Sequence, residues 1–181
     1  MLKPVNSRSV LWICLALLTF VVACGDAEAD SWKNAKIKRT AEAYEEFLAQ
    51  YPQSVHAQKA LVALEAVHFK QVQKDNTLKA VEEFLERHPD GLHAEEVRNT
   101  LELLHWVRAQ QGKSLAAYES FLKMYPETRF AEEAKIQMAP YALAEIMGSS
   151  DIKEYEDFLA RFPEGPSADS ARKTLEGLRS M

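Results

Sequence analysis

The sequence contains little cysteine. Its two cysteines, Cys14 and Cys24, both lie within the first 24 of 181 residues. The rest of the chain therefore cannot form a disulfide or supply a catalytic thiol. A fold built from it must depend on its apolar core.

Basic charge is also in deficit. The chain has 22 Lys and Arg residues against 27 Asp and Glu residues, which gives a formal net charge of −5. Nucleic acids and anionic membrane surfaces are bound mainly through an excess of Lys and Arg. The composition therefore argues against both as the main partner.

The sequence patterns of common enzymes are missing as well. No GxSxG, HExxH, P-loop or GxGxxG motif occurs, and no run of alternating β-branched residues indicates a strand. We therefore expect a protein that is not an enzyme and that needs no cofactor.

The N-terminal segment has the pattern of an export signal. Lys3 and Arg8 precede the apolar run VLWICLALLTFVV at residues 10–22, and the small Ala23 follows it. This run is shorter than the about 20 apolar residues of a membrane-spanning helix. A charged start, an apolar centre and a small final residue are typical of a cleaved signal peptide. Because residues 1–23 hold two of the positive charges, their removal changes the net charge from −5 to −7.

The rest of the chain contains a fourfold repeat. The phrases FLAQYPQS, FLERHPDG, FLKMYPET and FLARFPEG have their prolines at residues 52, 89, 126 and 163, so successive prolines are 37 residues apart. A constant period of this length is the signature of a repeat architecture.

Each repeat predicts a short helix that begins at a favoured N-cap residue and ends at the proline. The four N-caps are Thr40, Thr77, Ser114 and Asp151. The apolar stripe of the first copy is Tyr44, Phe47, Leu48 and Tyr51. These positions lie on one face of a helix, so each short helix has an apolar side to bury.

A longer helix is predicted after each proline. Its N-caps are Ser54, Gly91, Thr128 and Gly165, and the predicted helices cover residues 55–73, 92–111, 129–147 and 166–179. Trp32 falls in the column of Phe69 and Trp106, which indicates the end of a truncated long helix before the first repeat. The predicted fold class is all-α, an α-solenoid of about four helix pairs.

The repeat YEEFLAQYPQSVHAQKA and its copies resemble the tetratricopeptide-type repeats of bacterial outer-membrane lipoproteins, such as the β-barrel assembly lipoprotein and Tol-Pal coordinator families. The resemblance covers about residues 38–179. The period of this chain is longer than the about 34 residues of the standard unit. The resemblance implies a protein that binds other envelope proteins or peptides.

The end of the predicted signal, VVAC at residues 21–24, resembles the lipobox of bacterial lipoproteins. In that family the signal is cut before the cysteine, which is then acylated, so the resemblance implies a lipid such as palmitate on Cys24. An Asp directly after the cysteine tends to retain such proteins at the inner membrane. Here Gly25 stands in that position and Asp26 follows it, which favours the outer membrane. The predicted parts are a signal peptide at residues 1–23, a lipidated tether at 24–31 and the repeat domain at 32–181.

Two ExxH pairs are the candidates for metal chemistry. Glu65 and His68, and one repeat later Glu102 and His105, match part of the ligand set of di-iron helical bundles, which need two further Glu residues. The equivalent positions in the next repeat are Ala139 and Ala142, so we predict no metal site. His56, His88 and His93 stand alone, and we expect them to be edge or surface side chains.

Two regular columns and one proline are candidates for a binding surface. The acidic column is Glu45, Glu82, Glu119 and Glu156, and it is either a solvated helix face or a stripe that steers a basic partner. The aromatic column, Trp32, Phe69 and Trp106, is expected to pack between repeats rather than to bind a partner. Pro140 predicts a kink in the third long helix near residues 137–140.

The predicted function is that of a scaffold or adaptor, held at the outer membrane by its N-terminal lipid and facing the periplasm. A self-associating structural lipoprotein is the alternative, and a di-metal enzyme is a remote one. The expected partners are other envelope proteins or peptides and the membrane that the lipid enters, with no nucleic acid.

Overall fold

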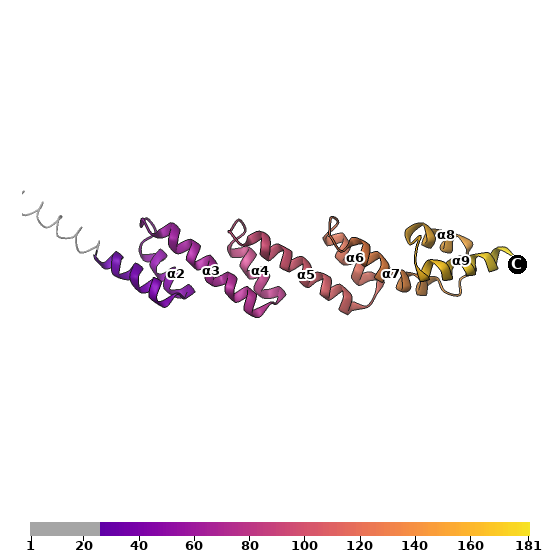
Figure 1. The fold of residues 1–181 in the computed structure, drawn as a ribbon, viewed down its shortest axis with the longest axis horizontal. Helices are drawn as coiled ribbons and strands as arrows, with labels where there is room; N and C mark the ends of the chain where they lie inside the picture. Colours follow the sequence, from indigo (N-terminus) through magenta and orange to yellow (C-terminus); the bar gives the residue numbers. More distant parts are fainter. Residues whose placement is uncertain (1–25) are drawn as a thin grey trace, which may run out of the picture. The chain divides into compact units, whose positions relative to one another are not determined.

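The computed structural model describes residues 26–181, which form helices and no strand. Residues 26–38 are helical. The later helices are α2 (Ala41–Gln50), α3 (Ala57–Asp75), α4 (Leu78–Arg87), α5 (Ala94–Gly112), α6 (Leu115–Met124), α7 (Ala131–Ile146), α8 (Ile152–Arg161) and α9 (Pro166–Arg179). Short and long helices alternate along the chain (Figure 1). The predicted fold class, an all-α repeat of helix pairs of the α-solenoid type, is confirmed.

The four short helices begin and end as predicted. Each has ten residues and an N-cap side chain that accepts a backbone hydrogen bond, at 3.3 Å for Thr40, 3.2 Å for Thr77 and Ser114, and 2.9 Å for Asp151. Each short helix ends immediately before the residue that precedes the proline. Proline disfavours the helical conformation of that residue and cannot itself continue the helix.

Three of the four long helices begin later than predicted. The hydroxyl of Ser54 accepts a hydrogen bond from the backbone N–H of His56 at 2.9 Å, and Thr128 does the same for Phe130 at 3.2 Å. These contacts close a turn, so α3 begins at Ala57 and α7 at Ala131. The prediction that Ser54, Gly91 and Thr128 are N-caps is therefore wrong by about two residues. Gly165 is the N-cap of α9 as predicted.

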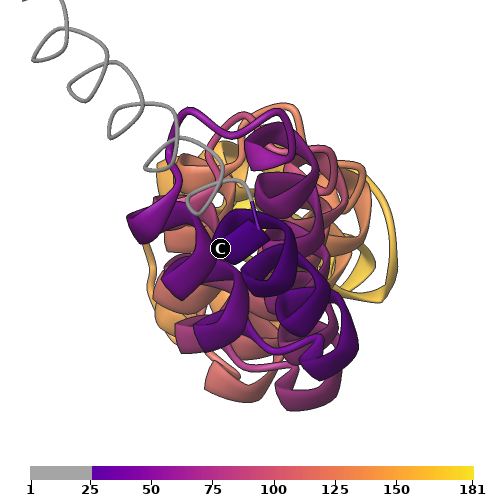
Figure 2. The ribbon, with the colours of Figure 1, turned by 90° about the vertical axis from the view of Figure 1, so that its left-hand side faces the viewer.

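The first compact unit comprises residues up to Val97. Within it, the helix of residues 26–38 packs against α2 and α3 through Trp32 and Ala35, which join a core with Phe47 and Ala60. Figure 2 shows the ribbon with this helix, in indigo, near the viewer. Trp32 lies in a helix, as predicted, and that this helix is a truncated long helix stays a prediction. Residues 26–31 of the predicted tether belong to the same helix. This part of the tether therefore extends by only about 1.5 Å per residue along the helix axis.

The second compact unit begins at Arg98, inside α5, and runs to Met181. Its core includes Trp106, Phe121, Met138 and Tyr155, and α7 packs against α6, α8 and α9. The helix α7 continues through Pro140 and has 16 residues, against 19 in α3 and α5. The kink that we expect near Pro140 stays a prediction.

Candidate functional site

Four junctions hold the helices together. A junction is the turn between a short helix and the next long helix, together with the side chains of the preceding long helix that contact it. The junctions are numbered from first to fourth by their prolines, Pro52, Pro89, Pro126 and Pro163. Because the repeat has a constant period, equivalent sequence positions recur at each junction, and at the first three junctions they are in contact.

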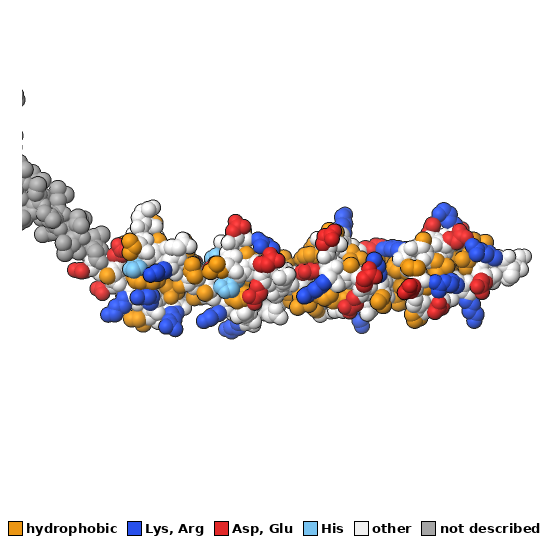
Figure 3. All heavy atoms as spheres, turned by 45° about the horizontal axis from the view of Figure 1, so that its top comes forward, with side chains coloured by type: hydrophobic (Ala, Val, Ile, Leu, Met, Phe, Trp, Pro, Cys, Tyr) orange, Lys and Arg blue, Asp and Glu red, His pale blue; other side chains and the backbone are white. Residues whose placement is uncertain are grey.

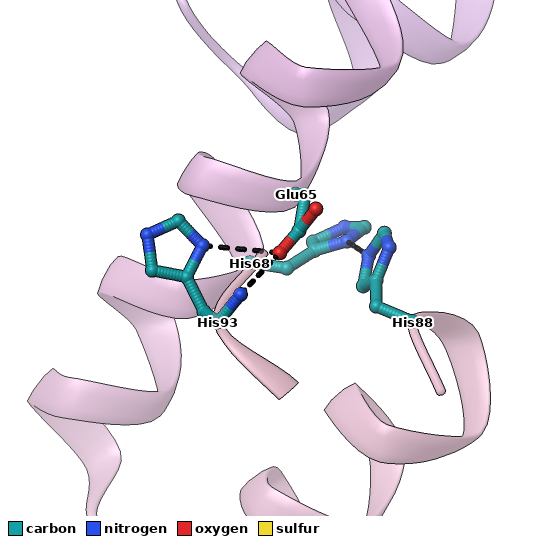
Figure 4. A network of polar contacts seen from close by, with 4 residues as sticks. All are labelled: Glu65, His68, His88 and His93. Atoms are coloured by element: carbon teal, nitrogen blue, oxygen red, sulfur yellow. Dashed lines mark hydrogen bonds and ion pairs between the residues drawn. The ribbon is translucent and has the colours of Figure 1, made fainter. Parts of the chain in front are cut away.

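A glutamate holds the turn at each of the first three junctions. Ser54 donates its hydroxyl hydrogen to Glu28 at 2.6 Å, and Thr128 donates to Glu102 at 2.5 Å. The second junction has Gly91 in place of the hydroxyl residue. There Glu65 accepts a hydrogen bond from the backbone N–H of His93 at 2.8 Å and lies 3.0 Å from Nδ1 of the same residue (Figure 4).

The carboxylate of Glu65 is held in its charged form although its side chain is buried. Burial opposes the charge, but the hydrogen bonds from the backbone and ring of His93 together outweigh this and lower the pKa of Glu65. A Cβ atom at Gly91 would lie 2.6 Å from the carboxylate oxygen, so Glu65 occupies the space that a larger residue would need. Glu65 therefore links α3 to the turn between α4 and α5 through its contacts with His93.

Stacked rings form the second contact of the first three junctions. Trp32 stacks on His56 with centroids 5.1 Å apart, Phe69 on His93 at 4.1 Å and Trp106 on Phe130 at 5.1 Å. Trp106 is only 4% exposed. The prediction that this aromatic column packs between repeats is confirmed, because its rings are used inside the junctions.

The ExxH histidines also bond within the junctions. Nδ1 of His68 lies 2.8 Å from Nε2 of His88, and one repeat later Nδ1 of His105 lies 2.7 Å from the hydroxyl of Tyr125. Within residues 26–181, no group of three or more His, Cys, Asp or Glu side chains could hold a metal ion. His56, His88 and His93, expected at edges or on the surface, all lie in the junctions.

The acidic column is exposed, and two of its four members form ion pairs in the second unit. Glu119 pairs with Arg161 at 2.7 Å, and Glu156 pairs with Arg179 at 2.5 Å. Acidic and basic side chains both occur on the face that Figure 3 shows. The arginines neutralise part of the negative charge that would attract a basic partner. Of the two alternatives for the acidic column, a solvated helix face therefore fits better than a stripe that steers a partner.

The fourth junction differs from the other three. Ala139 stands in the column of the glutamates, and the turn residue that would meet it is Gly165. Leu143 and Ser167 occupy the positions of the stacked rings. The junction has a pocket with a volume of about 770 Å³, lined by apolar residues of α7 and the α8–α9 turn. The apolar lining includes Ile136, Ala139, Pro140, Phe162, Pro163 and Pro166.

Charged side chains lie at the same pocket, with Glu132, Lys135, Arg161 and Glu164 among its lining residues. Lys135 is paired with Glu132 at 2.7 Å, and Arg161 is paired with Glu119. The pocket thus combines an apolar lining with charges of both signs. Such a lining suits apolar side chains of another protein better than a strongly charged ligand.

The comparison with known families matches this chain to a model described as outer membrane lipoprotein, YfiO, over residues 26–153. The chain belongs to this family. No curated protein matches the sequence significantly. The family match includes the first three junctions and ends at the start of α8, so the turn of the fourth junction lies beyond it.

Two observations bear on the membrane. Cys24, the predicted lipidation site, lies outside the described residues and before the family match. In the part of the chain that the structure describes, no helix has the length and apolar character needed to cross a bilayer.

Proposed function

We propose that this protein is a lipid-anchored adaptor of the outer membrane, which faces the periplasm and holds another envelope protein. The membership of an outer membrane lipoprotein family carries the proposal. The helix-pair repeat supports it, because such repeats bind proteins through extended surfaces. The ExxH residues also support it. The candidates for a metal site, Glu65, His68, Glu102 and His105, instead form hydrogen bonds that join helices and turns.

The anchor is the acyl group on Cys24, after removal of residues 1–23. A lipid chain adds about 0.8 kcal/mol of membrane affinity for each buried CH₂ group, and more than one chain is needed for stable anchoring. The Cys24→Ser protein should therefore move from the outer-membrane fraction to a soluble or uncleaved form and lose incorporation of labelled palmitate.

The matched control for the anchor is Cys14→Ser, because Cys14 lies inside the predicted signal peptide and is removed with it. This variant should keep both the membrane fraction and the palmitate label. If Cys24→Ser stayed labelled and membrane-bound, the anchor would be at another residue and the lipoprotein part of the proposal would be wrong.

The pocket of the fourth junction is the surface that we propose for the partner. Ile136 lines it and is 71% exposed, which leaves a large apolar side chain in water. Burial of apolar area against a partner would contribute about 25 cal/mol for each Å² removed from water. An apolar side chain of a second envelope protein is therefore the occupant that the lining suits.

The test is affinity capture from envelope extracts with the intact lipoprotein, its Ile136→Glu variant and its Asn99→Glu variant. Asn99 is the exposed residue one repeat before Ile136 and does not line the pocket. A defined envelope protein should be retained by the unchanged protein and by Asn99→Glu, and lost with Ile136→Glu. Recovery of only a second copy of this chain would favour the self-associating alternative. Equal retention by all three forms would exclude this pocket as the binding surface.

A further inference from the structure

His68 and His88 join two consecutive helices through a direct contact between their rings. His68 lies on α3, and His88 is the C-cap residue of α4. Their facing nitrogens are 2.8 Å apart, and both side chains are partly buried (Figure 4). The contact forms part of the second junction, beside the bond between Glu65 and His93.

This contact requires that at least one of the two rings is uncharged. A neutral imidazole has one N–H donor and one acceptor nitrogen, whereas a charged imidazolium has two donors. One charged ring can still donate to a neutral one. When both rings are charged, two N–H groups and two positive charges face each other at 2.8 Å. The hydrogen bond is then lost and replaced by repulsion.

The third junction has a contact at the same position that does not have this restriction. His105 faces the hydroxyl of Tyr125 at 2.7 Å, one repeat after His68 and His88. A tyrosine hydroxyl either donates or accepts a hydrogen bond. It can therefore accept from a charged His105 as well as donate to a neutral one. The two junctions differ chemically in this pair while the backbone framework is the same.

The charged groups around the histidine pair come from each helix packed against it. Burial is the main cause that lowers the pKa of both rings, and the positive charge of Arg87 on α4 lowers both further. Glu42 and Glu45 on α2 act in the opposite direction on His68, and Glu65 on α3 does so on His88. For both rings the result is a lowered pKa, so the folded protein resists protonation here.

We propose that the His68–His88 contact is a proton-sensitive latch, which holds α3 to the end of α4 at the second junction at neutral pH and releases it when both rings are protonated. The release is local to the first compact unit. The regulation is a property of the fold and does not depend on the identity of the partner or on the proposed function.

The direction of the pH effect follows from the lowered pKa values. An ordinary histidine has a pKa of 6.5, and both rings are below it in the folded protein. The unfolded chain therefore binds more protons than the folded one just below pH 6.5, and stability decreases as the pH is lowered. The stabilisation is complete above pH 6.5 and is lost as the pH falls through the lowered values.

The experiment is hydrogen exchange of the full-length protein in detergent at pH 7.5 and pH 5.5, read by mass spectrometry and corrected for the intrinsic exchange rate. Each measurement is made with and without EDTA. The variants are His88→Tyr, which copies the third junction, and Tyr125→His, which copies the second. In the unchanged protein, acidification should raise exchange several-fold in residues 78–91 relative to residues 115–128. His88→Tyr should abolish this difference, and Tyr125→His should produce it in residues 115–128.

A titration of the histidine ring signals by NMR gives a second measurement that needs no substitution. The signals of His68 and His88 in the unchanged protein should show coupled titration, in two steps that both rings report and that lie below pH 6.5. The proposal would be overturned if His88→Tyr lost protection on acidification as the unchanged protein does, or if the two rings titrated independently. A difference that required a metal ion, and so disappeared when EDTA was added, would also overturn it.

Discussion

The third and fourth junctions lie in the same compact unit and have related turn phrases, YPET and FPEG, but they hold their helices differently. At the third junction, Thr128 donates to Glu102 at 2.5 Å and Trp106 stacks on Phe130. At the fourth, the corresponding positions are Ala139, Gly165, Leu143 and Ser167, and a pocket of about 770 Å³ lies there.

This difference shows that a repeat can keep its helices and exchange its contacts. The short helices α6 and α8 have the same length and the same kind of N-cap at both places. Smaller side chains at the column positions remove a hydrogen bond and a ring stack and leave apolar surface open. The third junction therefore holds its turn with a hydrogen bond and a ring stack, whereas the corresponding positions of the fourth junction include residues that line a pocket.

The largest expected effect on stability comes from the ring stack of the third junction, compared with the leucine at the same position of the fourth. Trp106→Ala should reduce the free energy of unfolding by about 3 to 5 kcal/mol, because it empties a buried site. Leu143→Ala, at the same position of the next repeat, should cost less than half as much, because Leu143 is only partly buried. Urea unfolding followed by circular dichroism measures both. Equal losses would contradict the contrast between the two junctions.

The next largest effect on stability is expected from Pro140 in α7. Pro140→Ala restores a backbone N–H inside the helix and should stabilise the protein by up to about 3 kcal/mol. The matched change is Ala66→Pro at the equivalent position of α3, which should destabilise it by a similar amount or more. Thermal unfolding of the two variants tests this. A loss of stability with Pro140→Ala would show that the fourth junction depends on the proline.

The glutamate contact is expected to contribute less. Glu102→Ala leaves the buried hydroxyl of Thr128 without its acceptor, which should cost about 1 to 3 kcal/mol. The control is Glu119→Ala, which breaks an ion pair whose side chains are 47% and 45% exposed and should cost at most about 1 kcal/mol. Urea midpoints of the two variants decide the order, and a larger loss for Glu119→Ala would contradict the role of the junction glutamate.

The smallest effect concerns the first junction. Nδ1 of His56 is buried and has no hydrogen-bond partner within residues 26–181. His56→Phe copies Phe130 of the third junction and should stabilise the protein by about 1 kcal/mol. His93→Phe is the matched control and should destabilise it, because Nδ1 of His93 contacts Glu65. If both variants shifted the melting temperature in the same direction, the assigned contacts would be wrong.

The short helices could be predicted from the sequence because their signals are local. Thr40 caps the helix that it precedes, and Pro52 ends it just beyond the last of its ten residues. The starts of the long helices could not be placed as well. The hydroxyl of Ser54 serves a turn and bonds to Glu28, which is 26 residues away, so its role is set by a contact with another helix.

The candidate site was only partly predictable for the same reason. The sequence places Glu65 and His68 on one helix, but their partners His93 and His88 come from the next repeat. Alignment by the 37-residue period already contains the signal, because His105 and Tyr125 stand one repeat later. The pocket could not be predicted from the sequence. Ala139 and Gly165 indicate that a contact is lost at the fourth junction, but they do not show whether the helices move together and fill the space.

The central claim, that the fourth junction receives a partner, is tested most directly by photocrosslinking in living cells. A photoreactive amino acid is placed at residue 136 of the full-length lipoprotein and, in a matched strain, at residue 99. We predict that residue 136 captures one defined envelope protein, identified by mass spectrometry, and that residue 99 does not. Capture of the same proteins from both positions, or of no protein other than this chain from residue 136, would contradict the claim.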